Sequence, residues 1–478
     1  MRRALALLIA ISAAAWATQG TAAPASSATQ PNFVVVMADD QTFGEMGAMP
    51  QTRQRIGAAG ATFERFYASF PLCCPSRATF LTGQYSHNHG VLGNGTPVGG
   101  YYELNTRQTL GPWLQAAGYH TIHIGKFLNR YGLLDPTEVP QGWDEWYGAL
   151  QSSSDRYFGY QLNENGVLRR YGRSRADYKT YVEGDKAVEA IRRQAQQGAA
   201  GKPFFLFLGA LAPHLPATPA PRPATRFHRL RLPRGMAFNE RDVSDKPRFI
   251  RRLKRLSPSK LRKLESSYRD RASSLHALDD TIGQVLDEIE SQGLAQETYV
   301  VFLSDNGFFF GQHRLAKGKY LPYEPASRLP LMIRGPGIPA GSTSSELVGN
   351  IDLAPTFLEL AGASPGVEVD GRSLMPFARD PGLRTRRPIL FEANSVDRPS
   401  IGIPYTGIKT ERYSYIRYRN GEQELYDLDL DPRQLRSRHR DPRYAGTERA
   451  LAEALTRLRS CGGDSCRGEI GLIPGPAL

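Results

Sequence analysis

Six short clusters of polar and charged residues stand out because each follows an apolar run or begins a helix-like stretch. They are Asp39-Asp40, Cys73-Cys74-Pro75-Ser76-Arg77, Gly125-Lys126, Pro213-His214, Ser304-Asp305-Asn306-Gly307, and Lys317-Gly318-Lys319 with Tyr323-Glu324. Taken separately, each cluster has an ordinary explanation as a turn, a helix cap or a surface lysine. Only the set as a whole points to chemistry.

Four side chains in these clusters offer hard oxygen ligands, namely Asp39, Asp40, Asp305 and the amide of Asn306. This ligand set suits Ca²⁺ or Mg²⁺ better than zinc, which prefers histidine and cysteine. Positive charge would surround the same point, from Arg77, Lys126 and Lys319. A divalent cation with several cationic side chains forms a site for a tetrahedral anion such as sulfate or phosphate.

The longest motif is the run from Cys73 to Gly83, which reads Cys-Cys-Pro-Ser-Arg-Ala-Thr-Phe-Leu-Thr-Gly. This run resembles the signature of the type I, formylglycine-dependent sulfatases. The double cysteine and the segment Gly125-Lys126-Phe127-Leu128-Asn129-Arg130-Tyr131 are similar to N-acetylglucosamine-6-sulfatases and extracellular endosulfatases. The resemblance covers about residues 32–440. It implies an alkaline-phosphatase-like α/β sandwich with a large mixed, mostly parallel sheet.

In that family a maturation enzyme oxidises the first cysteine of the signature to Cα-formylglycine, so the resemblance implies this modification at Cys73. The hydrated aldehyde would carry two hydroxyls: one attacks sulfur and the other later expels sulfate. The implied activity is hydrolysis of sulfate esters on a sulfated small molecule or glycan, with N-acetylglucosamine 6-sulfate as a candidate substrate. The implied cofactors are formylglycine at position 73 and a divalent cation, Ca²⁺ in preference to Mg²⁺.

The resemblance also implies roles for individual residues. The metal ligands would be Asp39, Asp40, Cys73 as formylglycine, Asp305 and Asn306. The catalytic residues would be Cys73, Arg77, Lys126, His214 and Lys319. Lys319 is preferred to Lys317 because it stands five residues before Glu324, as the family's lysine does before its Tyr-Glu pair.

Two further positions are candidates for substrate contact. Many sulfatases have a histidine two residues after the first lysine, but here that position holds Leu128, followed by Asn129. Asn129 would offer a neutral hydrogen bond instead. His313 follows the Asp305 loop in the sequence and is the second candidate, with a packed loop histidine as the alternative interpretation.

These clusters need secondary structure that brings them together. Phe33-Val34-Val35-Val36-Met37 is a continuous apolar run, typical of a strand buried on both faces. Further strands are predicted at His120–Ile124, Phe204–Leu211, Tyr299–Leu303 and Leu329–Ile333. Apolar residues from Leu275 to Ile289 recur with helical spacing. Strands that alternate with helices predict an α/β fold with a largely parallel sheet, whose carboxyl strand ends gather functional sites.

The pattern changes near residue 395, where short strands are predicted at Ser400–Ile408, Arg412–Tyr418 and Glu422–Leu428. An amphipathic helix follows over residues 446–459. We therefore predict a catalytic domain over residues 32–390 and a smaller antiparallel-sheet-plus-helix domain over residues 391–478. Cys461 and Cys466 are expected to form a local disulfide if the protein is exported, with a pair of exposed thiols as the alternative.

The first 25 residues are typical of a secretory signal. Arg2-Arg3 precede the apolar run Ala4–Trp16, and small residues follow as far as Ala25. The apolar run is short for a membrane span, although an uncleaved anchor is the alternative. We expect a secreted or extracytoplasmic protein without stable membrane insertion after cleavage.

The formal charge of +13 is concentrated in one segment. Residues 222–263 contain eleven arginines and four lysines against three acidic residues. No helix-turn-helix or stacking-aromatic motif accompanies them, which disfavours nucleic acid as a partner. The segment either attracts sulfated glycans near the pocket entrance or is a solvated helical face.

Composition and motifs leave three functional classes open. A chain with 40% hydrophobic and 22% charged residues is globular, and four cysteines exclude a disulfide-built scaffold. The leading hypothesis is a sulfuric ester hydrolase. The alternatives are a phosphonate or phosphate ester hydrolase of the same superfamily and, if Cys73 is unmodified, a non-catalytic polyanion-binding protein.

Overall fold

The computed structural model describes residues 30–198, 201–221, 227–393 and 403–477. The predicted signal segment, residues 1–25, lies outside them. Within the described residues the helices are α1 Pro50–Thr52, α2 Cys73–Thr82, α3 Ser86–His89, α4 Leu110–Ala116, α5 Lys179–Ala195, α6 Arg248–Arg251, α7 Pro258–Ser291, α8 Glu324–Ser327, α9 Leu353–Ala361, α10 Met375–Arg379, α11 Ala445–Leu458 and α12 Asp464–Arg467. None of these described helices is both long and apolar enough to cross a lipid bilayer.

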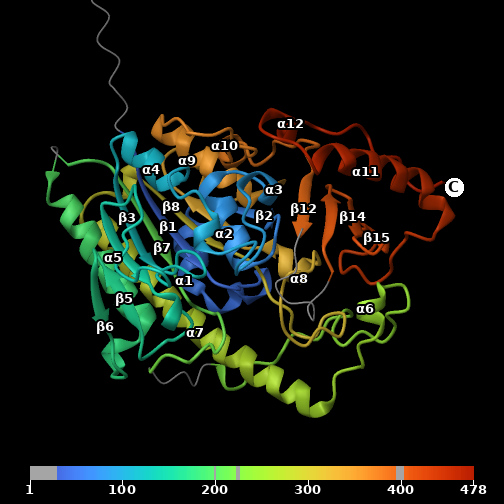
Figure 1. Cartoon of the computed structure of the whole chain (residues 1–478), viewed down its shortest axis with the longest axis horizontal. Helices are drawn as coiled ribbons and strands as arrows, with labels where there is room; N and C mark the ends of the chain where they lie inside the picture. The colour runs from blue at the N-terminus through green and yellow to red at the C-terminus, as the bar shows by residue number, and fades with distance from the viewer. Residues whose placement is uncertain (1–29, 199–200, 222–226, 394–402, 478) are drawn as a thin grey trace, which may run out of the picture.

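One large mixed sheet forms the centre of the molecule (Figure 1). Its strand order is β11-β2-β10-β8-β1-β7-β3-β4-β5-β6, and β9 pairs with β2. The strands are β1 Asn32–Ala38, β2 Ala61–Tyr67, β3 His120–Gly125, β4 Glu145–Ala149, β5 Gln161–Glu164, β6 Val167–Arg170, β7 Phe204–Gly209, β8 Thr298–Ser304, β9 Arg328–Leu329, β10 Leu331–Arg334 and β11 Ser342–Gly349. The five central strands, from β8 to β4, are parallel. The predicted α/β fold with a largely parallel sheet is therefore confirmed.

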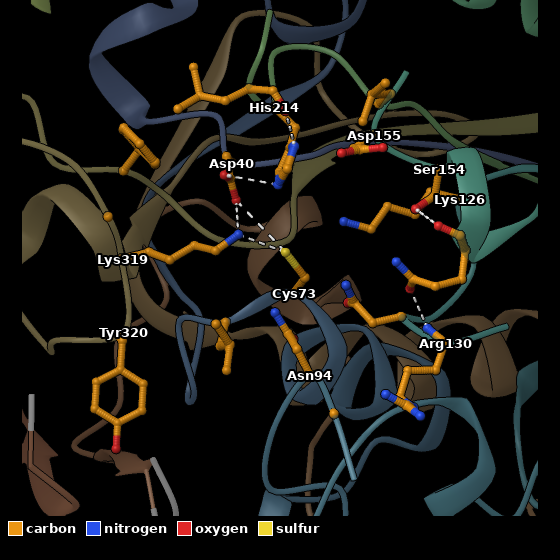
Figure 2. A pocket seen from close by; sticks show the side chains of 18 of the residues that line it. Asp40, Cys73, Asn94, Lys126, Arg130, Ser154, Asp155, His214, Lys319 and Tyr320 are labelled. Atoms are coloured by element: carbon orange, nitrogen blue, oxygen red, sulfur yellow. Dashed lines mark hydrogen bonds and ion pairs between the residues drawn. The ribbon is translucent and has the colours of Figure 1, made fainter. Parts of the chain in front are cut away.

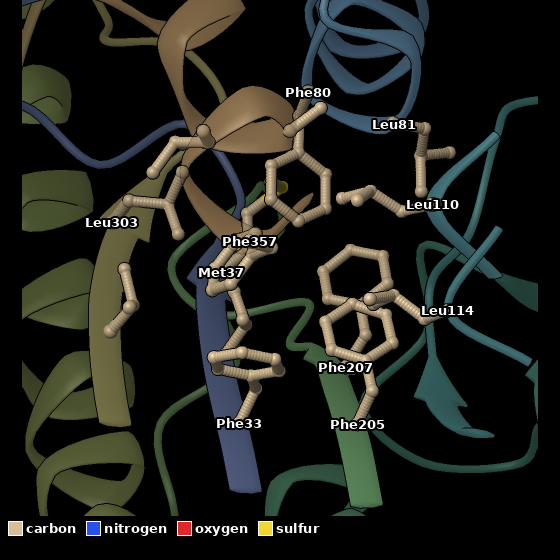
Figure 3. Packing of buried hydrophobic residues seen from close by; sticks show 14 of the residues in the cluster. Phe33, Met37, Phe80, Leu81, Leu110, Leu114, Phe205, Phe207, Leu303 and Phe357 are labelled. Carbon is tan, nitrogen blue, oxygen red and sulfur yellow. The ribbon is translucent and has the colours of Figure 1, made fainter. Parts of the chain in front are cut away.

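Strand β1 lies at the middle of the parallel region, paired with β7 on one side and β8 on the other. All seven of its residues are buried, as the apolar run predicts. Phe33, Val35 and Met37 face one core with Phe205, Phe207 and helices α2, α4 and α9 (Figure 3). Val34 and Val36 face the other core, which helices α5 and α7 cover. The sheet is thus the middle layer of a three-layer sandwich.

The predicted strand Leu329–Ile333 is interrupted. Pro330 separates β9 from β10, because proline has no backbone N–H to donate to a neighbouring strand. Strand β10 also runs antiparallel to β8, so the sheet changes direction beside its parallel centre. The predicted strand Phe204–Leu211 ends earlier, at Gly209.

A second, four-stranded antiparallel sheet follows, with the order β12-β13-β14-β15. Its strands are β12 Ile389–Ala393, β13 Tyr405–Lys409, β14 Tyr413–Tyr418 and β15 Gln423–Asp427. Helix α11 covers one face through Leu451 and Leu455. Strand β12 was not predicted, and residues 400–402 of the predicted strand Ser400–Ile408 lie outside the described residues. Cys461 and Cys466 form a disulfide after α11.

A buried carboxylate joins the small sheet to the loop before α8. Glu424 on β15 is fully buried and accepts hydrogen bonds from three tyrosine hydroxyls. Tyr418 and Tyr426 come from the small sheet, and Tyr323 comes from the loop before α8. Because a buried carboxylate must be hydrogen bonded, this contact fixes the loop that contains Lys319 and Tyr323 against the small sheet.

Candidate active site

The candidate site lies at the carboxyl ends of the central parallel strands. Strand β1 ends just before Asp39, β8 ends just before Asp305, and β3 ends just before Lys126. His214 follows β7, which pairs with β1. The carboxyl ends of parallel strands meet at one edge of a sheet, so these four side chains converge. Helix α2 begins at Cys73 and adds the sulfur to the same edge (Figure 2).

Asp40 has a backbone conformation that its position in the site explains. Its φ of 71° is in the left-handed region, which residues other than glycine rarely adopt. The backbone N–H of Asp40 donates to Oδ1 of Asp305 at 3.0 Å, and the Asn306 amide donates to Oδ1 of Asp40 at 2.7 Å. These contacts hold Asp40 in the strained turn, and such strain clusters at functional sites.

Three cationic side chains contact the carboxylates. Arg77 donates from Nε to Oδ2 of Asp305 at 2.7 Å. Lys126 forms an ion pair with Asp39, and Lys319 forms one with Asp40. The sulfur of Cys73 lies 3.5 Å from Oδ1 of Asp39 and 3.9 Å from Oδ1 of Asp40. The site therefore alternates positive and negative charge within a few ångströms.

One glycine permits this close packing. A Cβ added at Gly209, the last residue of β7, would lie 2.1 Å from the carbonyl oxygen of Lys126 and 3.1 Å from Nη1 of Arg77. Nη1 of Arg77 itself donates to the Lys126 carbonyl at 2.7 Å. Any larger residue at position 209 would displace the backbone that presents Lys126.

Burial and neighbouring charges shift the pKa values of the site. Burial alone would raise the pKa of Asp39, but Lys126 and His214 outweigh it and hold that pKa well below its usual range. Burial and the negative charge of Asp39 raise the pKa of Cys73 to about 12. An unmodified Cys73 thiol therefore stays protonated at neutral pH and is a weak nucleophile.

The described residues fit a hard divalent cation. Oδ1 of Asn306 is buried and has no hydrogen-bond partner among the described residues. Ligand atoms of Asp39, Asp40, Cys73 and His214 all lie within 4.8 Å of one another. Ca²⁺ and Mg²⁺ bind carboxylate and amide oxygens, so an amide oxygen without a partner next to two buried carboxylates matches the ligands of such a site. His214 joins this group because its Nε2 lies 3.8 Å from Oδ2 of Asp40.

A cavity of about 900 Å³ opens in front of Cys73. Asp40, Lys126, Asn129, His214 and Lys319 line it. The other lining residues include six polar side chains to which the sequence assigned no role, which are Asn94, Arg130, Gln151, Asp155, Arg156 and Tyr320. In Figure 2, Lys126, Arg130, Ser154 and Asp155 lie across the cavity from Lys319. Arg130 belongs to the segment from Gly125 to Tyr131 but had no assigned role, and the other five of the six residues belong to no recognisable motif.

The structure separates the two candidates for substrate contact. Asn129 lines the cavity, and its Oδ1 is buried without a partner among the described residues. Leu128 is buried in the apolar core instead. His313 is also buried: its Nδ1 lies 2.7 Å from Glu240 Oε2, and its ring packs on Tyr323. His313 is not among the residues that line the cavity, and its contacts are those of the packed loop histidine that was the alternative interpretation.

Lys317 and Lys319 also differ in position. Lys319 lines the cavity and contacts Cys73, whereas Lys317 is exposed and is not among the residues that line it. The glycine between the two lysines has a φ of 120°. That turn gives the two lysine side chains different surroundings, and it places the lysine that the motif prefers in the site.

Comparisons with known proteins agree with this geometry. The sulfatase family model matches residues 31–363, and the model for the C-terminal part of N-sulphoglucosamine sulphohydrolase matches residues 311–461. N-acetylglucosamine-6-sulfatase of Capra hircus is 33% identical over 94% of this chain and 87% of its own length. The human N-acetylglucosamine-6-sulfatase is also 33% identical, over 93% of this chain and 87% of its own length.

Solved structures show the same fold. One is described as a complex with its substrate D-glucosamine-2-N,6-O-disulfate; it has a TM-score of 0.78 and 27% identity, and covers 90% of this chain and 98% of its own. A phosphonate monoester hydrolase of Agrobacterium radiobacter has a TM-score of 0.69 at 22% identity, covering 90% and 95%, and shows the fold alone. The alkaline-phosphatase-like fold is confirmed. The chain belongs to the sulfatase family and is a sulfuric ester hydrolase.

Proposed function

We propose that this enzyme removes sulfate from the 6-position of glucosamine-type sugars, using a formylglycine made from Cys73 and a bound Ca²⁺. The observation that carries the proposal is the position of Cys73. This residue begins α2 at the cavity floor, within hydrogen-bond distance of Lys319 and close to two carboxylates. Relatives named N-acetylglucosamine-6-sulfatase and a neighbour bound to a disulfated glucosamine support the sugar class.

The cation would be held by Asp39, Asp40, Asp305, Asn306 and the group at position 73. When bound, a divalent cation withdraws negative charge from sulfate oxygens and lowers the pKa of a nearby hydroxyl. Formylglycine in its hydrated form supplies two hydroxyls on one carbon, which separates attack on sulfur from release of sulfate. Ca²⁺ is preferred to Mg²⁺ because it accepts several carboxylate and amide oxygens in flexible geometry.

The cationic side chains of the chain would bind the sulfate group and orient it. Asp40 and Cys73 raise the pKa of Lys319 and Asp39 raises that of Lys126, despite burial that alone would lower both. Both ammonium groups are therefore charged, and both line the cavity. Arg77 holds Asp305 and the Lys126 backbone in place. Fixed positive charges of this kind stabilise negative charge that develops on a tetrahedral anion.

His214 is the candidate proton donor to the leaving oxygen. Its ring lines the cavity, and Nδ1 lies 2.7 Å from the carbonyl oxygen of Leu215, which orients the ring. The opposite nitrogen, Nε2, then faces Asp40 and the cavity. In its imidazolium form, with a proton on each ring nitrogen, His214 would give the Nε2 proton to the sugar oxygen as the S–O bond breaks. Asn129 would hydrogen bond to the sugar through its unpartnered amide oxygen.

We also propose the division into a catalytic domain over residues 32–390 and a smaller domain over residues 391–478, although the first strand of the small sheet begins at Ile389. Export through the signal at residues 1–25, and modification of Cys73 by a maturation enzyme, complete the proposal. Support comes from relatives named extracellular sulfatase, such as the Drosophila melanogaster protein, which is 33% identical over 77% of this chain.

Mass spectrometry of the peptide that contains Cys73 tests the proposal most directly. Formylglycine lowers the peptide mass by about 18 Da relative to cysteine. The modified protein should release sulfate from N-acetylglucosamine 6-sulfate, and the folded Cys73→Ala variant should release none. Full activity of Cys73→Ala would contradict the mechanism, and an unmodified, inactive protein would favour a non-catalytic polyanion-binding role.

A phosphonate or phosphate ester hydrolase is the second candidate, since solved phosphonate monoester hydrolases share the fold. The discriminating measurement is kcat/KM on an aryl sulfate and on an aryl phosphonate with the same leaving group. A higher kcat/KM for the sulfate is expected. A higher value for the phosphonate would replace the proposed substrate class while leaving the assigned nucleophile intact.

A further inference from the structure

An acid-free stretch with many cations lies outside the candidate site. Between Lys246 and Leu264 the sequence has no acidic residue. Eight cationic side chains in this stretch are exposed, and we call them the basic surface: Arg248, Arg251, Arg252, Lys254, Arg255, Lys260, Arg262 and Lys263. They belong to helix α6, the loop after it and the first turns of α7, which lie on the same side of the molecule (Figure 1).

Few of these charges are neutralised within the described residues. Only Arg251 forms an ion pair there, with Glu422 at 3.6 Å. Two acids that precede the basic surface have other partners: Glu240 bonds to His313, and Asp245 bonds to Lys246 and to the Ser437 backbone. Asp242 accepts from the Ser244 backbone. The basic surface is thus a concentration of like charge, which repels itself and favours a bound anion.

The placement of three cations adds to this repulsion. Lys260, Arg262 and Lys263 lie in the first two turns of α7, and no acidic residue is present in its first turn. The helix dipole disfavours positive charge at a helix amino end. Lys260, in the first turn, therefore stands where the helix dipole disfavours a cation.

The basic surface is fixed relative to the cavity. Leu256 and Leu264, which flank its second half, pack in one apolar cluster with Phe308 and Leu215. Phe308 and Leu215 also line the cavity. The Arg314 guanidinium donates to the carbonyl oxygens of Glu240 and Arg241, before the basic surface, and of Leu253, within it. These bonds tie the stretch to the loop that carries Lys319. The basic surface is therefore connected by packing to one wall of the cavity.

We propose that the basic surface binds the anionic chain of a sulfated polysaccharide, one sugar of which occupies the cavity. This inference rests on the proposed function, because it takes the sulfated sugar in the cavity as part of a longer polyanion. Sulfate and carboxylate groups along the chain would pair with exposed arginine and lysine side chains. The basic surface would raise kcat/KM on polymers and leave the reaction on a single sugar unchanged.

Two other polyanions fit the basic surface less well. Nucleic acid is bound with aromatic side chains that stack on bases, but the one aromatic residue in the stretch, Phe249, packs on Tyr418 with ring centroids 5.4 Å apart. A membrane surface is bound by apolar side chains next to the cations. None of the exposed large apolar residues among the described residues lies between Lys246 and Leu264.

The test compares two triple variants. The first replaces Arg252, Lys254 and Arg255 by serine, since these exposed side chains have no ion pair among the described residues. The control replaces Arg449, Arg457 and Arg459, which are exposed on and just after α11 of the small domain. We measure kcat/KM on a 6-sulfated glucosamine polysaccharide and on N-acetylglucosamine 6-sulfate, at 50 mM and 500 mM NaCl.

The first variant should lose about tenfold in kcat/KM on the polymer at low salt and nothing on the monosaccharide. The loss should shrink at high salt, because ions screen exposed charges. The control should behave as the unaltered enzyme. An equal loss in both variants, an equal loss on both substrates, or no loss on the polymer would overturn the inference.

A binding measurement separates this inference from the proposed function. The Cys73→Ala protein and its two triple variants are titrated with a heparin oligosaccharide of defined length. Weaker binding only in the Arg252/Lys254/Arg255 variant supports the basic surface even if the monosaccharide proves not to be a substrate. Tighter binding to anionic lipid vesicles or to single-stranded RNA at the same salt would contradict the assignment of a glycan.

Discussion

The ammonium group of Lys319 lies 2.7 Å from the sulfur of Cys73 and forms an ion pair with Asp40. Of the two residues that Lys319 contacts, Cys73 begins α2 and Asp40 follows β1. Cys73 stands 246 positions from Lys319 in the chain. Lys319 is therefore placed to contact whatever group is attached at position 73 and, at the same time, to balance a carboxylate that would bind the cation.

This contact predicts different roles for two neighbouring lysines. Lys319→Ala should lower kcat/KM on an aryl sulfate about a hundredfold, which corresponds to roughly 3 kcal/mol of barrier. Lys317→Ala is the matched control and should have little effect, because Lys317 is exposed and outside the cavity lining. Equal losses in the two variants would show that the lysines act through general charge rather than position.

The orphaned amide oxygen predicts a specific effect on metal binding. Asn306→Ala should weaken Ca²⁺ affinity by at least about tenfold, because it removes an oxygen ligand that no other described group satisfies. Asn129→Ala is the control, since Asn129 lines the cavity away from the assigned ligand set; it should raise KM and retain metal affinity. Calcium affinity is measured by titration calorimetry of the metal-depleted proteins, and a loss in Asn129→Ala alone would refute the ligand assignment.

The link between the small sheet and the loop before α8 predicts a stability effect. Tyr323→Phe removes one of three hydroxyls that donate to buried Glu424 and should lower the free energy of unfolding by about 1–2 kcal/mol. Tyr171→Phe removes a hydroxyl that donates to the less buried Glu164, so its effect should be smaller. Urea unfolding at fixed pH gives both values. A larger loss of unfolding free energy in Tyr171→Phe would contradict the prediction that the Tyr323 hydroxyl is important because Glu424 is buried.

The pH dependence of stability should contain a contribution from His87. Burial alone would lower its pKa, but Glu392, 2.9 Å away, raises it to about 8 from the usual 6.5. The folded state therefore binds this proton more tightly than the unfolded state does. The resulting stability, about 1–2 kcal/mol, is fully present below pH 6.5 and is lost as the pH rises through about 8.

Two substitutions test this contribution. His87→Gln should lower the unfolding free energy at pH 6 more than at pH 9, when both are compared with the unaltered protein. Glu392→Gln removes the partner and should abolish the same pH-dependent difference. A constant difference between His87→Gln and the unaltered protein across this range would show that the imidazolium is not stabilised by folding.

The Cys461–Cys466 disulfide should affect stability and leave catalysis unchanged. The bond closes a short loop, so the chain-entropy estimate for its contribution is about 2 kcal/mol. The Cys461 carbonyl oxygen also holds the loop: it accepts a hydrogen bond from the Asn88 amide and lies 2.9 Å from Nε2 of His87. The double serine variant should unfold at lower urea concentration and keep kcat/KM. A loss of activity in the folded variant would indicate that the loop supports the cavity.

Much of the site could be predicted from local patterns. The apolar run ending before Asp39 is long and buried on both faces, so its burial and its position near the sheet centre follow from composition. The run that begins at Cys73 is a continuous motif of eleven residues, so it can be recognised from the order of its residues without knowledge of the fold. The same holds for Asp305 and Asn306, which directly follow another apolar strand. Residues in these positions converge because parallel strands share one carboxyl edge.

The sequence by itself determined the parallel strands beneath the site, and its motifs predicted the reactive groups and favoured Lys319 over Lys317. Only the tertiary structure decided that His313 packs on Tyr323 and Glu240 while Asn129 faces the cavity, and that Arg130 and Asp155 form its opposite wall. The physical reason is that strand ends are placed by hydrogen-bonded register, which local sequence encodes. Loop side chains are placed by packing between segments far apart in the chain, which no local pattern contains.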